Sequence, residues 1–89
     1  MTDSPYELAH ARLDAAHLPA TLFAPIRDLI DRVYEGEDDL PLRAEVTSVA
    51  NRYGTTRMRD CVSDFVAKLD LDAIRAEGAA DRAREGGEA

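Results

Sequence analysis

The spacing of large apolar residues predicts helices along most of the chain. The clearest stripe lies in residues 56–69, where apolar side chains recur every three or four positions, as one face of an α-helix requires. Its members are Met58, Cys61, Val62, Phe65, Val66 and Leu69. A second stripe in residues 21–35 consists of Leu22, Ile26, Leu29, Ile30 and Val33. We expect these two helices to form the centre of the core, with Cys61 buried as a small apolar residue.

Residues that cap or interrupt helices set the remaining limits. Ser4, Pro5 and Glu7 form a helix start, because Ser and Glu can satisfy free backbone N–H groups and proline needs no donor in the first turn. This start predicts a helix over 5–16. Prolines, glycines and capping side chains predict the other helices at 21–35, 41–53 and 56–69, with caps at Thr21, Asp39 and Thr55 or Thr56. Gly54 is expected to end the third helix in a left-handed conformation.

The pattern therefore predicts an all-α fold, a small bundle of four short helices in a single domain over residues 1–77. A fifth helix forms if Asp70 caps the segment up to residue 77 separately, and otherwise that segment extends the fourth. Residues 78–89 contain no large apolar residue. We therefore expect them to be a mobile, disordered acidic tail rich in glycine and alanine.

Charge limits the class of partner. The chain has 89 residues with 18 acidic and 11 basic side chains, a net charge of −7. This charge repels nucleic acids and anionic membranes and favours another protein, including a basic one, as the partner. The single cysteine and the lack of a signal peptide or an apolar run of ~18 residues indicate a cytoplasmic protein without a membrane segment. The abundance of Ala, Arg, Asp, Glu and Gly is typical of GC-rich bacterial or phage genomes.

The first predicted helix carries a candidate metal site. Glu7 and His10, then Asp14 and His17, form two acid-x-x-His pairs seven residues apart. Helical bundles use such pairs to bind iron, manganese or zinc. A site within one chain would need inward-facing ligands from other helices, and the helix predicted at 21–35 offers none in its apolar stripe. A dimer that pairs the first helix with its copy could supply them. The solvated polar side of a helix explains the same residues without metal.

Residues 42–69 suggest a second alternative, a DNA-binding helix-turn-helix. Ala50 and Gly54 match the small residue and the turn glycine of that motif, but Asp60 stands where a buried β-branched residue is expected. The motif therefore fits only if its turn is about two residues longer. The residues that would contact DNA are Arg52, Thr55, Thr56, Arg57 and Arg59.

No residue pattern indicates a catalytic nucleophile, a phosphate-binding loop or a cofactor site, so we expect no enzymatic activity. The favoured hypothesis is a small acidic helical module that acts by binding another protein, as an adaptor, regulator or inhibitor, and that forms a homodimer. Its interface residues would be those at the edge of a wide apolar arc. They are Tyr6, Leu13, Phe23, Ile30 and Tyr34. The alternative is that the first helix covers this arc within the monomer.

Overall fold

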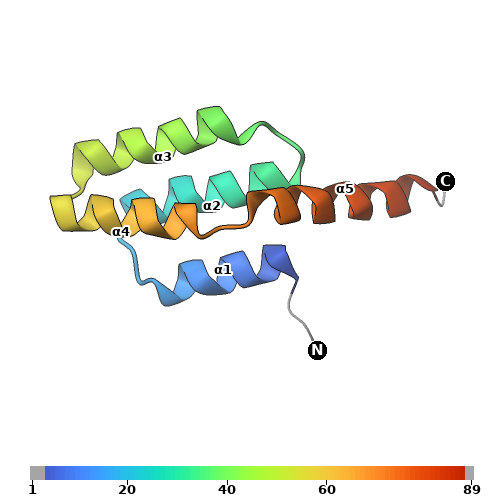
Figure 1. Ribbon diagram of the computed structural model, residues 1–89, viewed down its shortest axis with the longest axis horizontal. Coiled ribbons are helices and arrows are strands. Elements are labelled where there is room, and N and C mark those ends of the chain that lie inside the picture. The colour runs from blue at the N-terminus through green and yellow to red at the C-terminus, as the bar shows by residue number, and fades with distance from the viewer. Residues whose placement is uncertain (1–3, 88–89) are drawn as a thin grey trace.

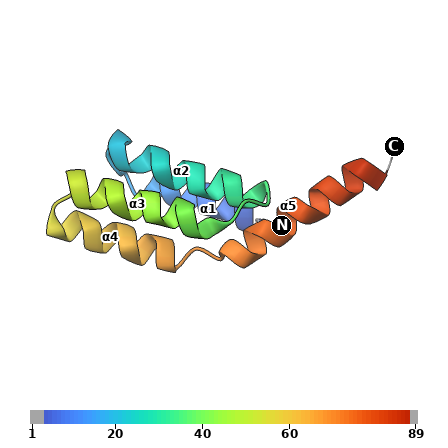
Figure 2. The same cartoon turned by 90° about the horizontal axis from the view of Figure 1, so that it is seen from above.

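The computed structural model describes residues 4–87, which form five α-helices and no strand (Figure 1). The helices are α1 (Pro5–Ala15), α2 (Ala20–Tyr34), α3 (Asp39–Tyr53), α4 (Thr56–Ala67) and α5 (Leu71–Gly87). The predicted all-α class is thus confirmed for this part of the chain. Helix α2 lies in the middle, with α1, α3 and α5 packed against it, whereas α4 packs mainly on α3 (Figures 1 and 2).

Three of the predicted helix caps are confirmed, and two of these begin α1 and α4. The Ser4 hydroxyl accepts a hydrogen bond from the N–H of Glu7 at 3.1 Å, and the Thr55 hydroxyl accepts one from the N–H of Met58 at 3.2 Å. Each bond satisfies a backbone donor that has no partner within its own helix. Local sequence chemistry therefore determines where α1 and α4 begin.

The other two predicted caps are wrong. Helix α3 is capped by Asp38 instead of Asp39, because the Asp38 carboxylate accepts the N–H of Leu40 at 3.1 Å. Helix α2 begins before Thr21, without a side-chain cap. There the Pro19 carbonyl accepts the N–H groups of Leu22 and Phe23 at 2.9 and 2.8 Å, so the backbone alone starts the helix.

The connection between α3 and α4 is short and extended. Gly54 has φ −95° and ψ 149°, so the predicted left-handed conformation is wrong. The left-handed glycine is Gly36 after α2, with φ 97°. Because Gly54 leads directly into the Thr55 cap, α4 turns back beside α3 in antiparallel orientation (Figure 2).

The core is built around α2 and leaves α4 at its edge. The buried apolar side chains are Ala9, Leu13, Leu22, Ile26, Leu29, Ile30, Val33, Val46, Ala50, Val62 and Ile74. Five of them belong to α2, as predicted, but α4 contributes only Val62. The predicted central role of α4 is therefore wrong, because α4 packs mainly on α3 and is not among the helices that pack closely on α2. Phe65 is half-buried, and Cys61 is exposed instead of buried.

Helix α5 packs against α2 instead. Ile74 is 1% exposed, and Gly78 is buried so close to α2 that a Cβ atom there would overlap the Tyr34 carbonyl group. The carboxylate of Asp70 accepts the N–H of Ala73 at 3.1 Å, which confirms that α5 starts as a separate helix. Helix α5 continues past residue 77, where the predicted tail begins, without a break.

The predicted tail agrees only in part with the structure. The chain stays helical to Gly87, and two residues beyond Gly78 contact the end of α2. Tyr34 donates a hydrogen bond to Asp81, and Arg82 donates one to the Tyr34 carbonyl at 2.6 Å. The last turns of α5 project beyond the other helices (Figure 2). Residues 88 and 89 of the predicted tail lie outside the described residues.

Candidate functional site

A groove lies between α1 and α4, which are not in close backbone contact along their length. Its main cavity has a volume of about 630 Å³. The residues that line it are Arg12, Ala15, Ala16, Cys61, Asp64, Phe65, Lys68 and Leu69. The groove exists because α4 is anchored through α3 and only one of its side chains is fully buried.

The groove continues along α1 toward its N-terminus. A second cavity of about 240 Å³ is lined by Pro5, Leu8, Ala9, Arg12, Lys68, Leu69 and Asp70. Because Arg12, Lys68 and Leu69 line both cavities, the two form one continuous surface. It follows the 11 residues of α1, a length of about 16 Å at ~1.5 Å per residue.

The groove combines apolar walls with a charged rim. Its apolar residues include Phe65 and Leu69, which are half-buried, and Leu8, which is 38% exposed. On the rim, the Lys68 ammonium lies 2.9 Å from the Asp64 carboxylate, but the two side chains are 70% and 65% exposed. Such an exposed pair contributes only about 0.3–0.5 kcal/mol to stability. The pair therefore leaves both charges accessible to a partner.

The five residues predicted as an interface differ in how deeply they are buried within the chain. Leu13 and Ile30 are fully buried, so a partner that binds the folded bundle cannot contact them. Phe23 is half-buried and packs on the core. Tyr6 and Tyr34 are half-buried, and their ring centroids are 4.3 Å apart. Contacts within one chain therefore account for Leu13 and Ile30 in full and for the other three residues in part.

Tyr6 joins α1, α2 and α5 through polar contacts. Its hydroxyl donates a hydrogen bond to Asp31 at 2.7 Å, and its N–H donates to Glu77 at 3.0 Å. The same Asp31 oxygen lies 2.8 Å from His10 Nε2. Burial, together with the adjacent Asp31 carboxylate, raises the pKa of Tyr6 to about 12.

This shift predicts a loss of stability at high pH. Unfolded Tyr6 ionises near pH 10, whereas the folded protein keeps its proton to about pH 12. The stabilisation is therefore complete below pH 10 and is lost as the pH rises from 10 to 12. Urea unfolding across this range should show a fall in the free energy of unfolding that is smaller for Tyr6→Phe. Tyr53→Phe, at a 63% exposed position, is the control and should behave like the unaltered protein.

The candidate metal ligands are not brought together. Glu7 and Asp14 are exposed on α1. His17 lies beyond the end of α1 in a left-handed conformation with φ 52°, so the expectation of two acid-x-x-His pairs on one helix is wrong. His10 contacts Asp31, as described above. Among residues 4–87, no group of three or more His, Cys, Asp or Glu side chains is arranged to hold a metal ion.

The predicted helix-turn-helix segment has a different geometry. The two helices of that motif cross at about 90–120°, whereas α3 and α4 lie side by side in antiparallel orientation. Thr55 caps α4 and Thr56 begins it. Arg52, Arg57 and Arg59 are exposed near the turn, and within the described part of the chain none has a carboxylate within 4.0 Å.

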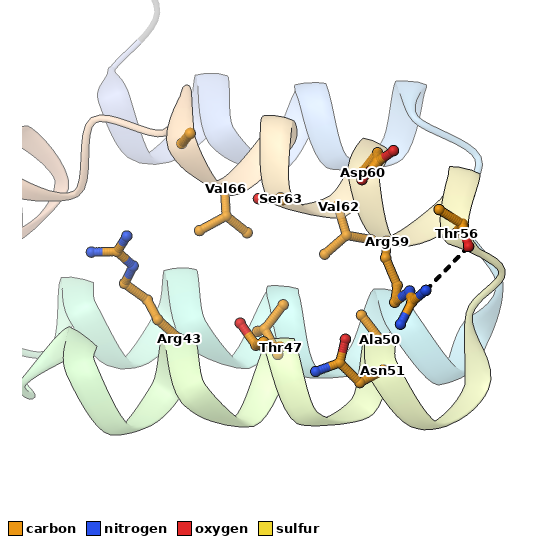
Figure 3. A pocket seen from close by; sticks show the side chains of 12 residues that line it. Arg43, Thr47, Ala50, Asn51, Thr56, Arg59, Asp60, Val62, Ser63 and Val66 are labelled. Carbon is orange, nitrogen blue, oxygen red and sulfur yellow. Dashed lines mark hydrogen bonds between the residues drawn. The ribbon is translucent and has the colours of Figure 1, made fainter.

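A separate opening of about 380 Å³ lies between α3 and α4 (Figure 3). Val46, Ala50 and Val62 line its apolar part, and Arg43 and Arg59 stand toward its two ends. Both arginines already have partners. Arg43 lies 3.5 Å from the Asp39 carboxylate, and Arg59 donates to the Thr56 hydroxyl at 3.1 Å.

Comparisons with known protein families, with curated proteins and with solved structures find no match to this chain. None of the helices in the described range is long and apolar enough to cross a membrane.

Sequence reasoning missed the groove, although it identified part of its lining. Cys61, Phe65 and Leu69 belong to the apolar stripe that predicts a buried face of the helix. The α1 wall, formed by Arg12, Ala15 and Ala16, has no apolar pattern that could reveal it. Only the placement of α4 beside α3 brings the two walls together.

Proposed function

We propose that this protein is a non-enzymatic interaction module that binds an α-helix of another protein in the groove between α1 and α4. The observation that carries the proposal is the continuous groove with apolar walls, which Phe65 and Leu69 line from α4 and Leu8 from α1. An amphipathic helix can place apolar residues at positions i, i+3 or i+4, and i+7 into such a surface.

The size and charge of the surface suit this kind of ligand. A length of about 16 Å corresponds to three helical turns. Arg12, Asp64 and Lys68 on the rim can fix the register of a bound helix through ion pairs. The net charge of −7 accelerates the approach of a basic partner, whereas the groove itself selects for apolar shape.

We place this activity in the cytoplasm. A single cysteine allows no internal disulfide, and Cys61 is an exposed thiol in the wall of the groove. Exposed free thiols persist best in a reducing compartment. The binding of a helix would make the protein an adaptor or an inhibitor, depending on the role of the bound helix in its own protein.

A matched pair of substitutions tests the proposal. Ala15→Glu places a long charged side chain in the groove, whereas Ala44→Glu makes the same change on α3, and both positions are exposed. The partner is isolated from the native host with the unaltered protein, and its affinity for each variant is then measured by calorimetry. We expect Ala15→Glu to weaken binding at least about tenfold, or 1.4 kcal/mol, with no effect of Ala44→Glu. Equal affinities for a folded Ala15→Glu variant and the unaltered protein would refute the role of the groove.

A further inference from the structure

We propose that the groove is occupied by α4 of a second copy of this chain, so that the protein without its partner is a two-fold symmetric dimer. This inference rests on the proposed function, because it uses the same helix-binding surface. It also determines how that surface is regulated, since a partner helix would have to displace the second copy.

The charges on the rim are complementary to themselves under two-fold symmetry. Asp64 and Lys68 are one helical turn apart and line the same groove. When two α4 helices pack in antiparallel orientation about an axis at the level of Val66, Asp64 of each copy faces Lys68 of the other. The same two residues therefore provide two ion pairs between the copies, as an interface with two-fold symmetry requires.

The apolar residues of α4 support the same occupant. Cys61, Phe65 and Leu69 all line the groove, and they lie on the side of α4 that α3 does not cover. In the dimer, each α4 would insert this face between α1 and α4 of the other copy. A small domain buries a modest fraction of its surface, so the additional apolar contact also compensates for the limited core.

Arg12 provides a further site for the second copy. It lines the groove beside Asp64 and Lys68, and within residues 4–87 no carboxylate lies within 4.0 Å of it. The entering α4 brings an exposed Asp64 to this part of the groove. The cation and the carboxylate thus meet only when two copies associate.

Charge reversal provides the test. Asp64→Lys places a lysine opposite Lys68 of the second copy, and Lys68→Asp places an aspartate opposite Asp64. We expect the unaltered protein to be a dimer in analytical ultracentrifugation at tens of micromolar, and each single variant to dissociate at least about tenfold more readily. An equimolar mixture of the two variants should form a heterodimer, because both ion pairs between the copies are then restored. Within each chain, by contrast, the pair remains broken.

A control pair separates this effect from net charge. Asp28 and Arg32 on α2 are also an acid and a base four residues apart, with a contact of 3.0 Å. Asp28→Lys and Arg32→Asp repeat the same charge changes there and should leave the dimer intact. A monomeric unaltered protein, single variants that dimerise normally, or a mixture that fails to associate would each overturn the proposal.

The two proposals fail in different ways. A protein that is monomeric but still loses its partner upon Ala15→Glu would refute the dimer and retain the helix-binding groove. The opposite result is a dimer that responds to Asp64→Lys and Lys68→Asp as expected, with a partner whose affinity is unchanged by Ala15→Glu. It would support the dimer and refute the proposed function.

Discussion

Ile30→Ala is expected to remove about 2–5 kcal/mol of stability, the largest loss of any single side-chain truncation that we predict. Ile30 is 0% exposed and lies on α2, the helix that contacts α1, α3 and α5. Its truncation leaves a cavity inside the buried core of the bundle. A domain of 89 residues has a free energy of unfolding of about 4–13 kcal/mol, at about 0.05–0.15 kcal/mol per residue. The expected loss is therefore a large share of the total stability.

Phe65→Ala is the comparison that locates the core. Phe65 has the larger side chain, but it is half-buried on α4 and lines the open groove. Its truncation should therefore cost about 1–2 kcal/mol, in proportion to the smaller area that is removed from water. Urea denaturation measures the difference, provided that the free energy of unfolding falls with urea concentration at the same slope in both variants. A loss at Phe65 as large as that at Ile30 would mean that α4 is central to the core.

Gly78→Ala is expected to destabilise the protein, although alanine is normally the better residue in a helix. Helix propensity alone would favour alanine by about 1 kcal/mol. A Cβ atom at this position, however, would overlap the Tyr34 carbonyl oxygen and lie 2.7 Å from its carbon. Backbone atoms cannot move aside as a side chain can, so α5 would have to shift away from α2, at a cost of about 1–3 kcal/mol.

The prediction is tested by whether Gly78→Ala lowers or raises the free energy of unfolding. Displacement of α5 should also weaken the contacts of Asp81 and Arg82 with Tyr34, and the tyrosine signals in near-ultraviolet circular dichroism should change. Thermal unfolding gives the stability. A gain of stability in Gly78→Ala would show that α5 does not pack closely on α2.

The contrast between α4 and α5 shows how far the sequence can predict this fold. The stripe of α4 shows that one face is apolar but does not determine which helix covers it, and in the structure α4 packs mainly on α3. Helix α5 lacks a long stripe, yet Gly78 brings its backbone against α2. A residue without a side chain adds nothing to a hydrophobic pattern, so its role in close packing is visible only in three dimensions.

Helix caps are harder to predict where two neighbouring side chains can both act as the cap. Ser4 and Thr55 act as predicted because each directly precedes its helix and its hydroxyl accepts a hydrogen bond from a free backbone N–H group. At α3, either of two adjacent aspartates could cap the helix. Asp39 instead forms an ion pair with Arg75 at 3.0 Å. That ion pair joins residues 36 positions apart, a relation that local sequence cannot reveal.

The hydrogen bond between Tyr6 and Glu77 has a consequence for the order of folding. It links residues 71 positions apart, and α1 and α5 both cover α2. The hairpins of neighbouring helices, α2 with α3 and α3 with α4, need only local contacts and can form early. The apolar face of α2 remains partly uncovered until α5 packs on it. We therefore expect the bundle to close during translation only after α5 has left the ribosome.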